Sequence, residues 1–232
     1  MTTTSIEKRL SAARYPEHRT FHGRVVRLEP LDPVVHGNSL YEGTHGEGRD
    51  VVWRYLFEGP FAERAAFDRY LQEAADSEDP LFFAIVNNAS GLAVGWAAFL
   101  RYEPRHRVIE VGHILYTPEL QRTIGATEAM YLMAQYVFED LSCRRYEWKC
   151  NALNEPSRRA AGRFGFTFEG IFRQHMIVKG RNRDTAWYSM LDTEWPSIKA
   201  NFERWLAPDN FDANGAQKMR LSIVNTPHSD SN

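Results

Sequence analysis

The chain has 232 residues, of which 43% are hydrophobic and 25% are charged, and its 28 basic and 30 acidic side chains leave a formal net charge of -2. This composition excludes a disordered, collagen-like or coiled-coil protein. Because the net charge is close to zero, the chain has no overall positive potential that would attract nucleic acid or an anionic membrane. A chain of this length can fold as one domain without a metal or a disulfide. Arginines far outnumber lysines, which favours local bidentate contacts to phosphate or carboxylate.

The cysteines and the apolar runs indicate where the protein resides. Cys143 and Cys150 belong to no CxxC or Cys/His cluster, so no metal site is expected, and their small number indicates a reducing compartment. Residues 1–20 contain no signal-peptide core, and the longest apolar stretch, 92–100, is too short to span a membrane. We therefore predict a cytoplasmic monomer or homodimer that binds neither nucleic acid nor a membrane.

The first half of the chain predicts a short helical region followed by strands in close succession. After an N-terminal arm, residues 1–20, the alternation and spacing of apolar residues predict a strand, two helices and three further strands. Short turn sequences join the last three strands, which indicates antiparallel pairing. The predicted ranges are 24–31 (strand), 34–45 and 61–76 (helices), and 81–87, 92–102 and 107–116 (strands).

The second half alternates helices and strands. Gly165 is placed to cap a helix, the KGRNR segment at 179–183 reads as a hairpin turn, and Thr193 reads as an N-cap. A crossover inside a mostly antiparallel sheet is expected, which gives an α+β (mixed α/β) domain over residues 21–207 and a partly disordered tail over 208–232. The predicted ranges are 124–141, 156–164 and 193–206 (helices) and 144–151, 167–178 and 184–191 (strands).

A strand, a loop and a helix start meet in residues 116–128. The first turn of a helix has N–H groups without intrahelical partners and the positive end of the dipole, so it can hold an anion. Gly125 and Ala126 would let a diphosphate approach the backbone, and Arg122 could add a charge-assisted contact. The alternative is that Thr123 or Gly125 only caps the helix.

Several motifs stand in the order found in one enzyme family. The sequence resembles the GNAT superfamily of acyl-CoA N-acyltransferases, and within it the Rim-type branch of ribosomal-protein-alanine N-acetyltransferase-like proteins. The family's cofactor loop is usually Gln/Arg-x-x-Gly-x-Gly/Ala; here Gln121 and Ala126 match, while Ile124 replaces the central glycine. The motifs are IEVGHILYTP at 109–118, QRTIGATEA at 121–129, NALNEPSRRAAGRFGFTFEGIFR at 151–173 and GRNRDTAWYSML at 180–191.

The resemblance implies a fold and a cosubstrate. The fold would be a six- or seven-stranded mixed sheet whose central parallel strands splay apart around the pantetheine arm of acetyl-CoA. Asn154 matches the position that reaches the pantetheine, and Ser157 matches the position that protonates the departing thiolate; alternatively Asn154 is an N-cap and Ser157 a first-turn residue. The other cosubstrate contacts would be Leu115, Tyr116, Gln121, Arg122, Thr123, Ile124, Gly125, Ala126 and Thr127.

Glu110 is the first candidate for the catalytic base. Strand alternation puts Glu110 on one face with Val108 and Ile114, and a carboxylate on an apolar face indicates either a catalytic role or a charged partner. The alternative to the catalytic role is a structural ion pair with Arg101, Arg105 or Arg107. The family often has a Glu here that accepts the amine proton. His113 is a rival expected on the opposite, packed face, and His175 is a second candidate base.

Candidate acceptor contacts come from two regions. Trp53 is either a wall of the acceptor pocket or a core residue. Asp184, in the predicted hairpin turn, either holds an ammonium group or shapes the hairpin. Three arginines of the same region either bind an acidic acceptor or form a solvated face: Arg173, Arg181 and Arg183.

The resemblance predicts transfer of an acetyl group from acetyl-CoA to a primary amine, first of all a protein N-terminal α-amine. An α-amine, with a pKa of about 7.7–8.0, is roughly 10% neutral at pH 7 and needs only modest help from a base. The alternatives are a small-molecule amine (an amino acid, polyamine or antibiotic) and a CoA-binding sensor without turnover. No metal is expected to take part.

Overall fold

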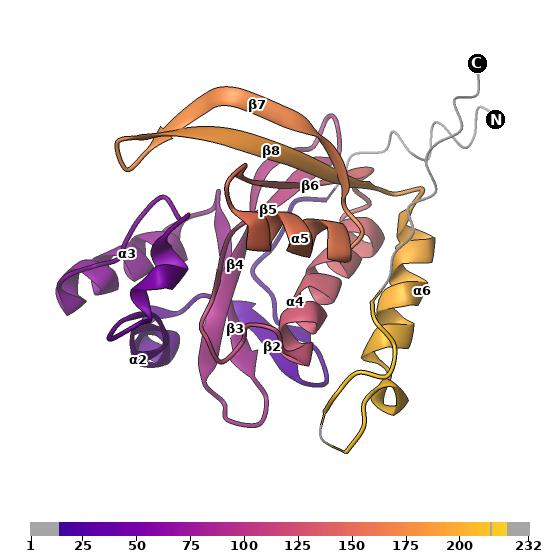
Figure 1. Ribbon diagram of the computed structural model, residues 1–232, viewed down its shortest axis with the longest axis horizontal. Coiled ribbons are helices and arrows are strands. Elements are labelled where there is room, and N and C mark those ends of the chain that lie inside the picture. The colour runs from indigo at the N-terminus through magenta and orange to yellow at the C-terminus, as the bar shows by residue number, and fades with distance from the viewer. Residues whose placement is uncertain (1–13, 214, 222–232) are drawn as a thin grey trace.

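One mixed sheet forms the centre of the computed structural model, which describes residues 14–213 and 215–221 (Figure 1). Its eight strands follow the order β1-β2-β3-β4-β5-β6-β8-β7, and only β5 and β6 run parallel. The predicted α+β class is confirmed, with one strand more than expected because β1 is too short to show a pattern. The strands are β1 Phe21–His22, β2 Val26–Pro30, β3 Leu81–Asn87, β4 Ala93–Glu103, β5 Val108–Tyr116, β6 Arg145–Asn151, β7 Thr167–Val178 and β8 Arg181–Leu191.

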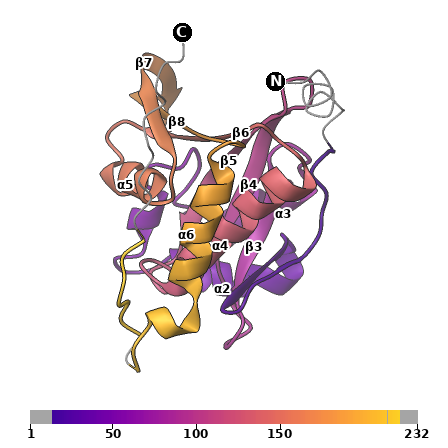
Figure 2. The same cartoon turned by 90° about the vertical axis from the view of Figure 1, so that its right-hand side faces the viewer.

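Helices cover both faces of this sheet (Figures 1 and 2). Phe67 and Leu71 pack with Trp96 in a core on the face of α2 and α3, and Met133 and Phe202 belong to the core on the face of α4 and α6. In the described part of the chain no helix is long and apolar enough to cross a membrane. The helices are α2 Pro33–Thr44, α3 Arg64–Asp76, α4 Ile124–Gln135, α5 Glu155–Arg163 and α6 Trp195–Leu206, with the short elements η1 Asp50–Trp53, η2 Tyr136–Asp140 and η3 Pro208–Asn210.

The parallel strands β5 and β6 pair along only part of their length. Val108–Val111 is in register with Arg145–Trp148, and no pairing between the two strands follows. From Gly112 onward, β5 stays paired with β4 alone. The predicted splay between the central parallel strands is therefore confirmed, and it leaves one backbone edge of β5 facing the gap.

A bulge interrupts β5 within this splayed part. Between the register pairs Trp96–Leu115 and Ala98–Gly112, β5 has one residue more than β4, and His113 takes a left-handed φ of 49°. An extra residue reverses the alternation of side chains between the two faces of a strand.

The bulge changes which residues share a face. Ile109 and Ile114 contact the core under α4, whereas Leu115 belongs to the core under α3. The His113 ring lies 5.2 Å from that of Phe82, which belongs to the α3-side core. The predicted separation of Glu110 and His113 onto opposite faces is therefore wrong, because it assumed an unbroken period of two.

The remaining predicted helices and strands are present, with two local corrections. The β7–β8 hairpin turn is only Lys179-Gly180, both at positive φ (50° and 71°), as in the tight turns that match strand twist. Arg181–Asp184 therefore lies in β8 and not in a five-residue turn. Helix α6 begins after Glu194 and not after Thr193, and a Glu194 carboxylate oxygen accepts a hydrogen bond from the Leu191 N–H (2.8 Å).

The predicted arm and tail lie only partly within the described residues, since 1–13 and 222–232 fall outside them. Where the arm is described, the Tyr102 hydroxyl donates to the Arg14 carbonyl (2.7 Å). In the tail, Phe211 forms an isolated bridge with Gln217, and Leu221 is buried in the α4-side core. Phe211 and Leu221 of the tail thus both contact the α4-side core.

Candidate active site

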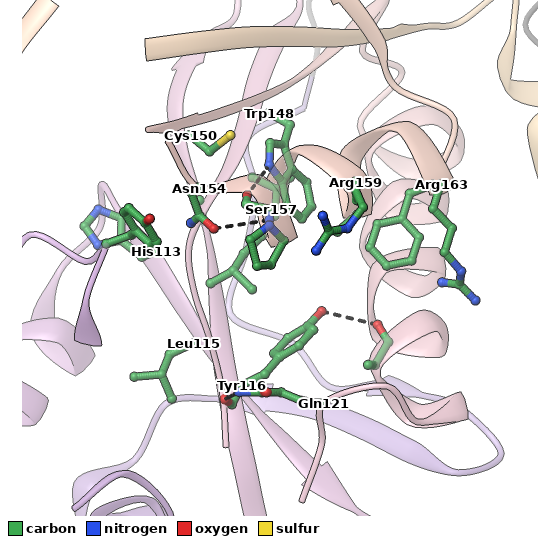
Figure 3. A pocket seen from close by; sticks show the side chains of 18 of the residues that line it. His113, Leu115, Tyr116, Gln121, Trp148, Cys150, Asn154, Ser157, Arg159 and Arg163 are labelled. Carbon is green, nitrogen blue, oxygen red and sulfur yellow. Dashed lines mark hydrogen bonds between the residues drawn. The ribbon is translucent and has the colours of Figure 1, made fainter. Parts of the chain in front are cut away.

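A cleft of about 1280 Å³ occupies the gap between β5 and β6 (Figure 3). On the α4 side it is lined by the loop 121–123, by the start of α4 and by α5. On the α3 side it is lined by residues 51, 52 and 54–57 and by Arg183 of β8. The cleft therefore passes through the sheet and has walls on both faces.

Cations surround the start of α4. The Thr123 hydroxyl is the N-cap and accepts from the Ala126 N–H (3.2 Å), as the capping alternative predicted. Arg122, Arg159 and Arg163 all line the cleft here, and Arg163 donates to the Thr127 hydroxyl (2.9 Å). A helix N-terminus with three guanidinium groups fits a diphosphate.

The loop conformation accounts for the departure at Ile124. Ile124 is the first residue of α4, and the left-handed φ of 62° falls on Arg122 instead. A glycine is therefore not needed at 124. Gly125 lies behind the cleft: a Cβ there would meet the Val26 side chain at 2.7 Å, so its small size allows α4 to approach β2.

The start of α5 forms the neighbouring wall. Asn154 is its N-cap and accepts from the Ser157 N–H (3.2 Å), so the capping alternative holds, and both residues also line the cleft. The Ser157 hydroxyl oxygen accepts from the Trp148 indole N–H (3.0 Å), as Figure 3 shows. The Cys150 thiol is a further hydrogen-bond partner of this hydroxyl.

Glu110 is buried, with 4% exposed, and lines the cleft at the fork of β5 and β6. Its Oε2 accepts from Arg101 (3.0 Å) and from Lys149 (2.8 Å). The prediction that Glu110 has apolar neighbours on its face of β5 is wrong, and the ion pair with Arg101, which was the alternative, is present. No described residue donates to Oε1, so this oxygen can accept a proton or a hydrogen bond from a ligand.

His113 lies on the same side of the cleft. Its ring is 5.5 Å from that of Phe57 and 5.2 Å from that of Phe82. Burial, assisted by the charges of Arg101 and Arg183, lowers the pKa of His113 to about 4. The imidazole is therefore neutral at pH 7.

Besides Gly125, three predicted site residues are not among those that line the cleft. Trp53 is fully buried and donates to the Thr44 carbonyl (3.0 Å), which is the core alternative. Asp184 accepts from the Gln174 N–H (2.7 Å), which shapes the hairpin and lowers the pKa of the carboxyl. His175 is exposed on β7 and lies 3.0 Å from the Thr185 hydroxyl.

The cleft also contains residues that the sequence reasoning missed. Arg159 and Arg163 are four residues apart, so their shared helix face could have been recognised. Lys149 could not, because its role depends on the register of β6 against β5. Among residues 14–213 and 215–221, no group of His, Cys, Asp and Glu side chains could hold a metal ion.

Comparisons with known proteins decide the family. Residues 28–167, more than half of the chain, match the model of the acetyltransferase (GNAT) domain. The chain belongs to the GNAT family of acetyltransferases. A crystal structure of a GCN5-related N-acetyltransferase from Brucella melitensis is 52% identical, covers 91% of this chain and 96% of its own, and superimposes with a TM-score of 0.89.

Two curated relatives of this GNAT acetyltransferase come from Bacillus subtilis. YnaD, named as an uncharacterized N-acetyltransferase, is 28% identical over 158 residues, 68% of this chain and 88% of its own. YdaF, whose name assigns it provisionally to ribosomal N-acetyltransferases, is 29% identical over 109 residues, 47% of this chain and 59% of its own. The predicted GNAT membership is confirmed, and YdaF agrees with the Rim-type resemblance.

Reversing the charge at the start of α4 should weaken CoA binding. Arg122→Glu places a carboxylate beside the proposed diphosphate position, and we expect a loss of about 1–3 kcal/mol in the free energy of CoA binding, measured by calorimetry at moderate salt. Arg69→Glu, on the exposed face of α3, is the matched control. Equal CoA affinities of the two variants would contradict this position of the diphosphate.

The lowered pKa of His113 makes stability depend on pH. Between pH 6.5 and 4 the unfolded chain binds a proton that the folded protein excludes, so the free energy of unfolding should fall by about 3 kcal/mol as the pH drops through this window. Urea denaturation of wild type and His113→Gln measures the difference, with exposed His106→Gln as the control. Parallel pH profiles for wild type and His113→Gln would show that His113 is not the cause.

Proposed function

We propose that this GNAT acetyltransferase transfers the acetyl group of acetyl-CoA to a primary amine, with protein N-terminal α-amines as the first acceptor class. The observation that carries the proposal is the position of Glu110, which lines the cleft at the fork of β5 and β6 and whose Oε1 accepts from no described residue. A carboxylate there can receive the proton of an amine that is bound at the gap between β5 and β6, where the two sides of the cleft meet.

The α4 side of the cleft has the features needed to hold CoA. The helix start with Arg122, Arg159 and Arg163 would bind phosphate groups, and the β5 edge at 112–116 offers backbone groups to a pantetheine chain. Acetyl-CoA, when bound, supplies the acetyl thioester.

Ser157 is placed to assist the leaving thiolate. Its oxygen is held by the Trp148 N–H, which fixes the side chain at the wall of the cleft, and its hydrogen would turn from the Cys150 thiol to the thiolate of CoA. A thiolate is a good leaving group, so this proton transfer needs only a hydroxyl and not a strong acid.

Glu110 acts on the acceptor amine before bond formation. The amine must be neutral to attack, and an α-amine is already roughly 10% neutral at pH 7. A carboxylate whose other oxygen is held by Arg101 and Lys149 is fixed in orientation, and it can take the amine proton directly or through one water. This modest demand fits an α-amine better than a lysine, whose pKa is about 10.4.

The choice of a protein α-amine rests on the Rim-type resemblance and on the relative YdaF. A small amine remains the alternative acceptor within the same chemistry. A sensor without turnover would not need Glu110 and Ser157 at the two walls of the cleft. Release of free thiol from acetyl-CoA with a panel of peptides and small amines tests all three: turnover supports an enzyme, and the preferred acceptor identifies its class.

Removing the Ser157 hydroxyl should slow turnover. Ser157→Ala should lower kcat several-fold while the KM for acetyl-CoA stays close to wild type, because the hydroxyl matters mainly in the transition state. A melting curve checks for the separate effect of leaving the Trp148 N–H without its partner. If only the KM for acetyl-CoA changed, Ser157 would be a binding residue.

Removing the Glu110 charge should produce a loss that depends on pH. Glu110→Gln keeps the shape but cannot accept a proton, so kcat/KM at pH 7 should fall by about 10²-fold, and the loss should shrink at high pH, where the amine is already neutral. Steady-state rates across the pH range measure this recovery.

The matched control for this variant is Glu147→Gln. Glu147 also pairs with Lys149 (2.7 Å) but does not line the cleft, so its replacement disturbs the ion cluster without removing the proposed base. Similar losses in the two variants, or a Glu110→Gln loss that is the same at every pH, would assign Glu110 a structural role.

A further inference from the structure

Arg183 is the one buried cation on the α3 side of the cleft whose charge the described residues leave unpaired. It is 7% exposed, yet no described carboxylate lies within ion-pair distance of its guanidinium. Its Nε donates to the Thr185 hydroxyl (3.2 Å), and the guanidinium lies 5.1 Å from the Phe57 ring centre. Arg173 and Arg181 of the same hairpin are exposed, so the solvated-face alternative applies to them and not to Arg183.

A buried guanidinium without a counter-ion is costly, and ligand anions are a common solution. The terminal nitrogens of an arginine form a planar fork that matches a carboxylate. Because Arg183 lines the cleft, this fork is within reach of a bound molecule.

A ligand anion that pairs with Arg183 would be distinct from the diphosphate proposed for the α4 side. Lys149 and Trp187 lie on the same face of the sheet as Arg183, since they alternate with the core residues Trp148, Ala186 and Tyr188. The three arginines at the start of α4 and on α5 lie across the sheet from this face. An anion at Arg183 is therefore on the side of Phe57 and His113.

We propose that the acceptor carries a carboxylate close to its amine, and that Arg183 binds this carboxylate while Glu110 receives the amine proton. The proposal rests on the proposed function for the role of Glu110. Glu110, His113 and Arg183 all line the cleft. The Glu110 charge acts on Arg183 and the Arg183 charge acts on His113, so a carboxylate and a guanidinium lie near the same part of the cleft. An ammonium and a carboxylate one residue apart are complementary to this pair. The two sources of such a carboxylate are an acidic side chain next to a peptide N-terminus and the carboxylate of a free amino acid.

The test compares acceptors that differ only in the anion. The peptide amides Ala-Asp-Ala-Ala and Ala-Asn-Ala-Ala form one pair, and alanine and alaninamide, compared at equal concentrations of neutral amine, form the other. We expect at least a ten-fold higher kcat/KM for one or both anionic members; the peptide pair and the amino-acid pair distinguish the two sources. Arg183→Gln should bring the ratio close to one by raising KM for the anionic acceptor, with the neutral acceptor and CoA affinity unchanged. Arg181→Gln, exposed on the same strand, should keep the wild-type ratio.

Binding of the reaction products gives a readout that does not need turnover. The N-acetylated forms of the two peptides and of the two amino-acid compounds are titrated calorimetrically into enzyme with CoA present. The anionic products should bind more tightly to wild type, less so to Arg183→Lys, which keeps the charge without the fork, and equally with the neutral ones to Arg183→Gln.

The outcomes separate the two proposals. If wild type acetylates both members of each pair equally well, the carboxylate proposal is wrong and the amine acetyltransferase function stands. If no amine is acetylated but the anionic products bind through Arg183, the anion site stands and the function of Glu110 must be revised. An anion preference that survives in both Arg183 variants would overturn the assignment of Arg183.

Discussion

Lys149 holds together the point at which the two central strands separate. Glu110 and Glu147 are register partners on the parallel strands β5 and β6, and like charges facing each other across strands are destabilising. The Lys149 ammonium lies 2.8 Å from one carboxylate and 2.7 Å from the other, and 4.0 Å from the centre of the Trp187 ring. Without this cation, two buried carboxylates would face each other near the last paired residues of β5 and β6. The free energy of folding would then be less favourable by several kcal/mol.

The same cluster makes the two carboxylates unequal. Arg145 binds Glu147 and also Glu169 of β7, which ties Glu147 into the far half of the sheet. Glu110, which lines the cleft, accepts from Arg101 and Lys149 on one oxygen only, and no described residue donates to its other oxygen. The ion pairs that keep β5 and β6 together therefore also select which carboxylate is available for chemistry.

The sequence was sufficient for most helices and strands and for the local structure at the starts of α4 and α5, and insufficient for the α3 side of the cleft. Helix α4 with its Thr123 cap and the start of α5 at Asn154 are local features, set by residues within a few positions of each other. The bulge at His113 leaves no sign in the alternation of apolar residues, so the faces of β5 were assigned wrongly beyond it. The burial of Arg183 depends on a two-residue turn and on Phe57, which is distant in the chain. Such contacts follow from the register of paired strands and not from local pattern.

A cleft with walls on both faces of one sheet has a consequence for the order of events. In the proposed arrangement, a nucleotide-bearing donor held by α4 and α5 and an acceptor held beside residues 54–57 would reach the fork from opposite faces, so neither would have to leave before the other arrives. Direct passage of a group between two simultaneously bound molecules then needs no covalent enzyme adduct. For such an arrangement, the lines of a double-reciprocal initial-velocity plot intersect, as in a sequential scheme. A single shared entrance would instead favour parallel lines, because the two substrates would occupy the site in turn.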